Sequence, residues 1–235
     1  MVLVAAACSS SPSAEEPAPS TTLAPTTLSA PSTTSVAATT TVPPTITTPP
    51  VTAPGGKVVA IIAAVDGTDT TTMPIPANVG RPAIIHAKYD GAASFVVRAL
   101  DAGGRRIATL ARSLGPYDGT FPVGFVNQSG NPVASLQVDT TGPWHLDITK
   151  PVLAPELSGR GVSGHGDAVL AYKGPAVSAR ITFAAPSAFA VNVFGNGAVT
   201  MLVSTVGPYN GTVAIPAGPA LISVTATGDW SMVLR

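Results

Sequence analysis

A short motif occurs twice in this chain, and its repetition limits the possible folds more than any other feature. Leu114–Thr120 reads Leu-Gly-Pro-Tyr-Asp-Gly-Thr, and Val206–Thr212 reads Val-Gly-Pro-Tyr-Asn-Gly-Thr. Each copy is followed by a related segment, Val138–Trp144 or Val224–Trp230, that ends in Gly-Pro-Trp or Gly-Asp-Trp. Two matches in the same order predict two sequence-related units in tandem.

Each predicted unit reads as a series of short strands. Trp144, Leu146 and Ile148 alternate with polar neighbours, as expected of a strand with one buried face. No segment shows sustained helical periodicity, and turn signals roughly every 8–12 residues favour an all-β fold, a jelly-roll or immunoglobulin-like sandwich in each unit. Strands are predicted at 58–65, 83–89, 95–99, 107–113, 120–125, 135–138 and 144–148, then at 168–172, 177–183, 188–193, 200–206, 212–215, 221–225 and 230–234.

The repeated motif is typical of a hairpin turn. Proline presets the backbone for the first central position of a turn, and Asp118 or Asn210 is tolerated in a tight turn. Gly119 or Gly211 is then expected to supply a positive φ. The motif therefore predicts a hairpin connection in each unit.

The aromatic residues of the two units have different predicted roles. Tyr117 and Tyr209 either cover the base of their hairpins or present a ring to a ligand, so they are the candidate ligand contacts. Trp144 and Trp230 are predicted to be core residues rather than sugar platforms, because each begins an alternating apolar face.

Composition and the internal repeat together divide the chain into five parts: 1–8, 9–54, 55–150, 151–161 and 162–235. In residues 9–54, Ser, Thr and Pro account for 31 of 46 residues. Such a segment has too little apolar surface to offset the entropy lost on ordering. This part is predicted to be a disordered stalk, either O-glycosylated or unmodified. Residues 55–150 and 162–235 are the two β units, and 151–161 is a connector rich in Pro and Gly.

The first part, Met1–Cys8, resembles a bacterial lipoprotein signal. Val2–Ala7 is apolar, small residues precede Cys8, and Ser9 follows it. The resemblance implies that Cys8 is acylated with diacylglycerol and anchors the protein to the membrane. Ala5 stands where that pattern usually has Leu, and no basic residue precedes Cys8. The alternative is that Cys8 is an ordinary residue of a disordered tail.

The β units resemble repeat domains of actinobacterial, mycobacterial-type, secreted and envelope proteins. In those domains a Phe-x-Val strand, a Gly-x-Tyr-x-Gly-Thr turn and a Gly-x-Trp strand recur in this order. The resemblance covers about 82–148 and 167–235. It implies a β-sandwich fold and an extracytoplasmic location but no activity.

Composition and residue spacing argue against several kinds of chemistry. Twelve Lys plus Arg balance 12 Asp plus Glu, and charged residues make up 10% of the chain, against about 25% in an ordinary domain, so no nucleic-acid partner is expected. The single cysteine cannot form an internal disulfide or a multi-thiolate metal site. Asp66–Asp69 has too few ligands for calcium and reads as a turn. We therefore expect no metal and no cofactor.

The three histidines do not form a recognisable catalytic pattern. His86, His145 and His165 lack the helical spacing of zinc proteases, and no Gly-x-Ser-x-Gly elbow accompanies them. His165 is expected in a glycine-rich connector, residues 164–167. No catalytic residue is predicted. A His within hydrogen-bond reach of a serine or carboxylate in a cleft would favour an enzyme instead.

The sequence thus predicts a membrane-anchored surface lipoprotein that presents a non-catalytic β-sandwich binding or structural module and extends into the cell wall. Its expected partners are the membrane, through Cys8, and a cell-wall glycan or envelope protein. One alternative is a glycan-binding module that uses Tyr117 and Tyr209, and the other is an envelope hydrolase.

Overall fold

The computed structural model describes residues 51–52, 58–59, 61–76, 82–124, 132–159, 161–195 and 197–235. Every described residue belongs to one compact unit of the chain. Cys8 and most of the predicted stalk lie outside the described residues. The last stalk residues include strand β1 (Val51–Thr52), which pairs with β2 (Val58–Val59).

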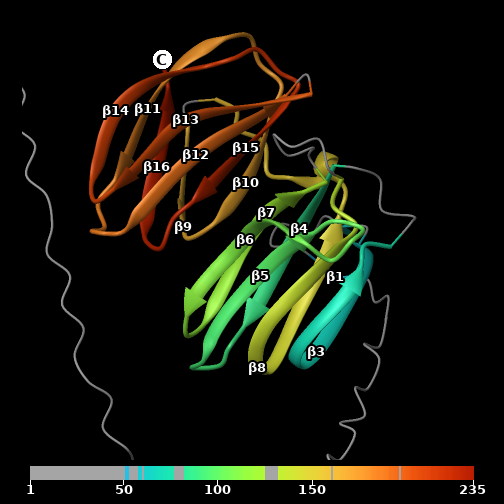
Figure 1. Ribbon diagram of the computed structural model, residues 1–235. Helices are drawn as coiled ribbons and strands as arrows, with labels where there is room; N and C mark the ends of the chain where they lie inside the picture. Colours follow the sequence, from blue (N-terminus) through green and yellow to red (C-terminus); the bar gives the residue numbers. More distant parts are fainter. Residues whose placement is uncertain are drawn as a thin grey trace, which may run out of the picture. The chain divides into compact units, whose positions relative to one another are not determined.

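The N-terminal half, residues 61–149, is a β-sandwich in which two long strands serve both layers (Figure 1). Strand β8 pairs with β3 along most of its length, with β5 through its first part and with β4 through its last part. One layer therefore runs β7-β4-β8-β3 and the other β6-β5-β8-β3, all antiparallel. The strands are β3 (Ile61–Pro74), β4 (Ala83–Tyr89), β5 (Ser94–Leu100), β6 (Arg106–Leu114), β7 (Tyr117–Val123) and β8 (Ser135–Thr149).

The C-terminal half, residues 162–234, has two separate four-stranded antiparallel sheets, β14-β11-β16-β9 and β10-β15-β12-β13. In this half two short strands, β9 and β10, take the place of the long strand β3. Likewise β15 and β16 take the place of the long strand β8. The strands are β9 (Val162–His165), β10 (Ala168–Tyr172), β11 (Val177–Phe183), β12 (Ala188–Gly195), β13 (Ala198–Val206), β14 (Tyr209–Ile215), β15 (Ala220–Thr225) and β16 (Asp229–Leu234). Between the halves lies a short 3-10 helix, η1 (Pro151–Leu153).

The predicted all-β class is confirmed, since the described residues contain strands, turns and η1 but no α-helix. Consistent with this, nothing in the described part of the chain forms a helix suited to crossing a membrane.

Each half has its own hydrophobic core. In the N-terminal core the ring of Phe95 lies 5.2 Å from that of Tyr89 and 5.3 Å from that of Tyr117. The corresponding rings of the C-terminal core are Phe183, Phe189 and Tyr209, with Phe189 at 4.5 and 6.1 Å from the other two. A small third cluster, in which Ile84 packs with Val169, Ala171 and Leu221, joins the two halves.

Both tryptophans are buried, as predicted. Trp144 and Trp230 are each 3% exposed. Each indole N–H donates to a backbone carbonyl across the sheet, that of Asp69 at 3.0 Å for Trp144 and that of Gly166 at 2.9 Å for Trp230. Each indole also lies against a strand glycine, and a Cβ added to Gly164 would come within 2.5 Å of the Trp230 ring. The polar edge of each ring is therefore satisfied inside the core.

The predicted hairpin connection is wrong in both units, because the strands on either side of the motif, β6 and β7 or β13 and β14, do not pair with each other. The turn also lies earlier in the motif than the sequence suggests. In each copy of the motif, the glycine with a positive φ is the one before the proline. These are Gly115, at 102°, and Gly207, at 98°. Gly119 and Gly211 instead lie inside strands β7 and β14, each under the ring of the tyrosine two residues earlier. A Cβ on Gly119 would come within 2.8 Å of the Tyr117 hydroxyl oxygen, so this glycine makes room for a side chain.

Two further local predictions are wrong. Asp66–Asp69, expected to be a turn, lies within β3. His165, expected in a glycine-rich connector, ends strand β9. In both places the polar residues belong to a strand because that strand pairs with a neighbour, β3 with β8 and β9 with β16. Their composition alone does not indicate a strand.

Candidate functional site

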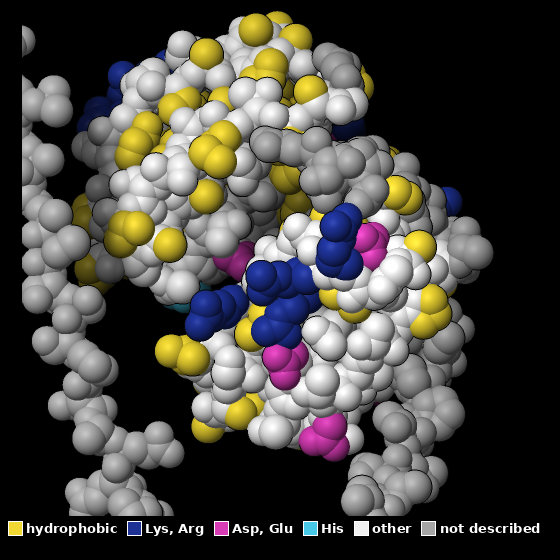
Figure 2. Space-filling model, in the orientation of Figure 1, with side chains coloured by type: hydrophobic (Ala, Val, Ile, Leu, Met, Phe, Trp, Pro, Cys, Tyr) yellow, Lys and Arg dark blue, Asp and Glu magenta, His cyan; other side chains and the backbone are white. Residues whose placement is uncertain are grey.

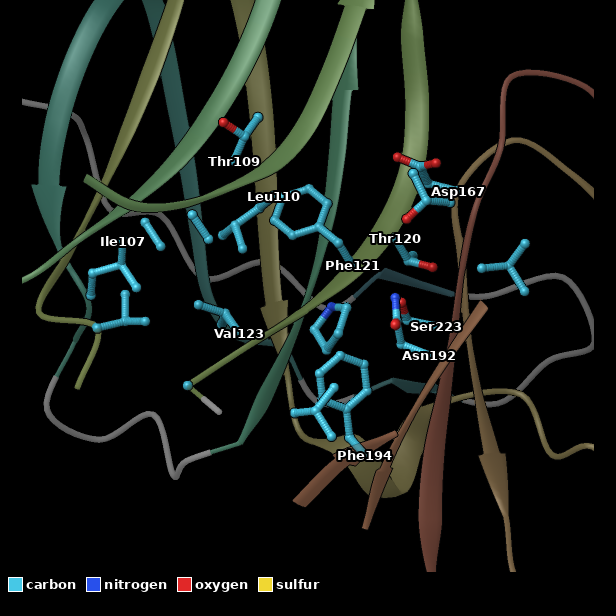
Figure 3. A pocket seen from close by; sticks show the side chains of 18 residues that line it. Ile107, Thr109, Leu110, Thr120, Phe121, Val123, Asp167, Asn192, Phe194 and Ser223 are labelled. Carbon is cyan, nitrogen blue, oxygen red and sulfur yellow. The ribbon is translucent and has the colours of Figure 1, made fainter. Parts of the chain in front are cut away.

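The two halves enclose a cavity of about 250 Å³ where β6 and β7 approach β12 and β15 (Figure 3). Its wall is largely apolar, and Thr120, Asn192 and Ser223 lie on the side where Asp167 lies, with Thr109 apart from them. The N-terminal half contributes Ile107, Thr109, Leu110, Thr120, Phe121 and Val123, and the C-terminal half contributes Asp167, Asn192, Phe194 and Ser223.

A wider groove of about 610 Å³ adjoins this cavity. The two share Thr109, Leu110, Asp167 and Thr225, and together we call them the junction cleft. The groove carries charges of both signs and several hydroxyl groups. Its charged and titratable lining residues are Lys88, Tyr89, Asp90, Arg112, Tyr117, Asp118, His165 and Asp167.

Asp167 lies at the base of the junction cleft and is bonded by both halves. The Tyr117 hydroxyl donates to its Oδ2 at 2.7 Å, and the backbone N–H of Ala226 donates to its Oδ1 at 2.8 Å. Burial raises the pKa of Asp167 above its ordinary value, although both hydrogen bonds oppose this. Burial and the nearby Asp167 carboxylate also raise the pKa of Tyr117, so the phenol remains a donor.

Backbone groups reinforce this contact between the halves. The N–H of Thr120 donates to the carbonyl of Asp167 at 3.0 Å, and the N–H of Val169 donates to the Thr120 hydroxyl at 2.9 Å. The cluster around Ile84 lies beside them. Because backbone atoms take part, the cleft walls are fixed by the strands themselves.

The two candidate tyrosines lie in different surroundings. Tyr117 is partly exposed and lines the junction cleft. Tyr209 is also partly exposed, but it lines a separate hollow of about 640 Å³ with Pro208, Asn210 and Trp230. The structure therefore does not bring the two rings together around one ligand.

A row of alternating His and Asp side chains crosses the outer face of the layer β7-β4-β8-β3. Asp118 lies 2.7 Å from His86 Nε2, and Asp147 lies 3.9 Å from His86 Nδ1. His145 Nε2 lies 2.9 Å from Asp147, and His145 Nδ1 lies 2.7 Å from Asp66. Both nitrogens of His145 therefore face carboxylates.

The charge state of His145 follows from these neighbours. Partial burial is the largest effect and lowers its pKa, but the hydrogen bonds and negative charges of Asp66 and Asp147 outweigh it, so the pKa is raised. The row thus joins β7, β4, β8 and β3 through close contacts between His and Asp side chains. Among the described residues no group of three or more His, Cys, Asp or Glu side chains is placed to hold a metal ion.

His165 is the histidine that lines the junction cleft. Its Nδ1 lies 2.8 Å from Asp229 Oδ1, and both side chains are largely exposed. No serine or threonine hydroxyl is hydrogen-bonded to it within the part of the chain that the structure describes. The carboxylate–histidine half of a hydrolytic arrangement is thus present at the rim, without a nucleophile joined to it.

Figure 2 shows basic side chains gathered over β5 and β6, next to acidic ones. Arg98 lies 2.7 Å from Asp139, and Arg105 lies 3.3 Å from Asp101. Hydrophobic side chains are scattered over the C-terminal half in the same view, where Val199 and Met201 of β13 are exposed. The charges over β5 and β6 are therefore partly neutralised by pairing.

Sequence reasoning did not identify Asp167 and Thr120, which line the junction cleft and join the two halves. Thr120 was visible as the last residue of the repeated motif, and Asp167 as a lone carboxylate after Gly166. Neither has a local pattern that indicates a contact, because the residues are 47 positions apart in sequence and belong to different halves. The recurrence of threonine at the end of the motif was the only signal.

Comparison with known proteins adds little. No protein-family model and no curated protein matches the sequence. Among solved structures, the chain is similar to one described as the triple jelly-roll fold and turret assembly of an archaeal virus, at 10% identity and a TM-score of 0.29, over 81% of this chain and 58% of that one. It is also similar to a conserved protein of unknown function from Pseudomonas aeruginosa, at 13% identity and a TM-score of 0.21, over 74% and 79% of the two chains. A calcium-binding mutant of Bacteroides uniformis β-glucuronidase 2 is matched at 13% identity and a TM-score of 0.23, over 71% of this chain and 22% of the enzyme. Likenesses at these scores carry no argument about function.

Proposed function

We propose that this protein is an extracytoplasmic lipoprotein whose β part is a non-catalytic binding module with its ligand site in the junction cleft. The observation that carries the proposal is the cleft itself. Its walls come from both halves, and its base is fixed by the Tyr117–Asp167 bond at 2.7 Å. A concave, partly apolar site with a few converging polar groups is the usual form of a ligand site.

We also propose that the two halves are tandem units related by duplication, preceded by a disordered stalk, as in the actinobacterial envelope repeats they resemble. Three features support the duplication. The strands pair in the same order, three aromatic rings recur in each core, and each tryptophan lies against a strand glycine.

The anchor is tested by mass and by partitioning. A diacylglyceryl group on Cys8 adds at least two acyl chains, enough for stable membrane attachment. The full chain expressed in an actinobacterial host is expected to enter the detergent phase with the added lipid mass, and Cys8→Ala is expected to stay in the aqueous phase. Equal partitioning of the two proteins would refute the anchor and leave the binding module untouched.

The lining of the cleft favours a neutral, hydroxyl-rich ligand, and a cell-wall glycan fits this chemistry. Lys88 and Arg112 offer donors, Asp90 and Asp118 offer acceptors, and Leu110 offers an apolar patch for the C–H face of a sugar. Because the groove carries both basic and acidic side chains, a strongly charged ligand would be repelled by the side chains of like charge.

The glycan proposal is tested by cosedimentation with purified, insoluble cell-wall glycan. Arg112→Ala is expected to weaken binding about tenfold, the cost of one charge-assisted hydrogen bond. Arg106→Ala is the matched control, since it lies on the same strand, is exposed and does not line the cleft. If the wild-type protein stays in the supernatant, or if both variants bind as it does, the glycan proposal is wrong.

The hydrolase alternative rests on the His165–Asp229 pair at the rim of the cleft. An oriented imidazole can act as a base for water, so soluble fragments released from the same glycan would favour catalysis. We propose that none are released. Release that is lost in His165→Ala would replace the binding module with an enzyme.

A further inference from the structure

The contact between the two halves joins two unlike surfaces. The N-terminal half contributes the outer part of β7, where Tyr117 and Thr120 make the bonds, and we call this the strand face. The C-terminal half contributes the corner between β9 and β10, where Asp167 and Val169 are bonded, and we call this the corner. In such a heterologous contact each half uses only one of these two kinds of surface, so the other kind remains unused on that half.

The C-terminal half carries a second strand face, on β14. Tyr209 and Thr212 occupy the motif positions of Tyr117 and Thr120. The pairing register agrees, since Tyr209 lies opposite Phe183 as Tyr117 lies opposite Tyr89. The Tyr209 ring also packs on Phe189 as the Tyr117 ring packs on Phe95.

The N-terminal half carries a second corner, on β3. The Trp144 indole donates to Asp69 and the Trp230 indole donates to Gly166, so Thr70 corresponds to Asp167. The local bonding agrees, because Thr70 Oγ1 accepts the N–H of Thr140 at 3.3 Å, as Asp167 accepts that of Ala226 at 2.8 Å. Two residues further on, Thr72 takes the place of Val169.

Neither of these second surfaces is covered in the part of the chain that the structure describes. The Tyr209 hydroxyl makes no hydrogen bond to another described residue, and the hollow of about 640 Å³ lies beside it. Thr70 and Thr72 are exposed. A carboxylate is also present at this corner. Asp139 Oδ1 accepts the Thr70 hydroxyl at 3.1 Å and Oδ2 is paired with Arg98 at 2.7 Å, and Oδ1 keeps a lone pair that can accept a phenol.

We propose that the strand face of β14 binds the corner of β3 in a second copy of this chain, so that the contact between the halves is repeated head to tail between chains. This rests on the duplication proposed above but not on the ligand of the cleft. Within one chain the short connector holds the halves at a high effective concentration, on the order of millimolar. Between chains the same contact is weak in dilute solution and gains strength where chains are crowded, as on a membrane.

Disulfide trapping tests the proposal in the full chain carrying Cys8→Ser. Thr212→Cys and Thr72→Cys proteins, mixed at up to about 1 mM and oxidised, are expected to form mixed dimers about tenfold faster than Thr72→Cys mixed with Ser204→Cys. Ser204 is the control because it is exposed on β13, in the other sheet. Adding Tyr209→Phe to the Thr212→Cys protein should slow trapping several-fold while the ring keeps its place on Phe189.

A double variant within one chain separates a failure of head-to-tail pairing from a failure of the contact between the halves that it repeats. Thr120→Cys with Val169→Cys in one chain should form an internal disulfide, since the two residues are bonded at 2.9 Å. If that disulfide forms while Thr212→Cys and Thr72→Cys cross-link no faster than the Ser204 control, head-to-tail pairing is wrong and the contact between the halves stands. If the internal disulfide does not form, both are wrong.

Discussion

Replacement of Trp144 by alanine is expected to lower the free energy of unfolding by about 3–5 kcal/mol, and Trp230→Ala is expected to do the same. Each indole is 3% exposed, so its removal leaves a cavity as well as lost apolar contact. The carbonyl of Asp69 or Gly166 would also lose the indole N–H that it accepts at 3.0 or 2.9 Å. The strand glycine below each ring has no side chain to fill the space.

Urea unfolding followed by far-ultraviolet circular dichroism measures this effect, since the variants lose a fluorophore. Leu114→Ala and Val206→Ala are the controls, because these side chains are 84% and 80% exposed and their loss should cost less than about 0.5 kcal/mol. Hydrogen exchange should further show that Trp144→Ala loses protection mainly in β4 and β8, because the two cores are separate. Stability unchanged in either tryptophan variant would mean that the ring is not a core residue.

The burial of the tryptophans could be predicted because it depends only on local alternation. Trp144 starts a run in which every second residue is apolar, and a strand with such a run can bury only one face. The same alternation located most of the strands. It failed in β3, where Asp66 pairs with His145 and Thr70 with Asp139, because polar residues joined across strands keep a strand in place without an apolar pattern.

The turn motif shows a different limit of sequence reasoning. Asp118-Gly119 has the composition of a tight turn, but the turn is made by Gly115 and Pro116. Gly119 is a glycine because the Tyr117 ring lies over it, and Asp118 is bonded to His86 on the next strand rather than to its own backbone. Glycine is used both for positive φ and for close packing, and only the fold distinguishes these uses.

The junction cleft could not be predicted at all. Tyr117 was a candidate for ligand contact, but its partner Asp167 lies in the other half, 50 residues away. No rule of strand periodicity or turn composition says how two β-sandwiches dock. What the sequence does contain is the repeated motif, whose Thr120 and Thr212 become informative only when the first is seen to bond Val169.

Removal of the Asp167 carboxylate is expected to loosen the contact between the halves. Asp167→Ala leaves the Tyr117 hydroxyl and the Ala226 N–H without an acceptor in a partly buried place, which should lower the free energy of unfolding by about 2 kcal/mol. Tyr117→Phe removes one donor and should cost about 1–2 kcal/mol. The double variant should lose about 1–2 kcal/mol less stability than the two single losses added together, since both substitutions remove the same bond.

Thr70→Ala is the matched control for this cycle. Thr70 accepts a backbone N–H at the corresponding corner but receives no tyrosine and is exposed, so its replacement should show no coupling to Tyr117→Phe.

The pH dependence gives an independent check. Because burial raises the pKa of Asp167, ionisation of this group disfavours the folded state, and the contribution of Asp167 to stability falls as the pH rises from its ordinary pKa of 3.8. Asp167→Asn cannot ionise, so its stability relative to the wild type should improve over that range. Strictly additive costs, together with an unchanged pH profile in Asp167→Asn, would show that Tyr117 and Asp167 do not hold the two halves together.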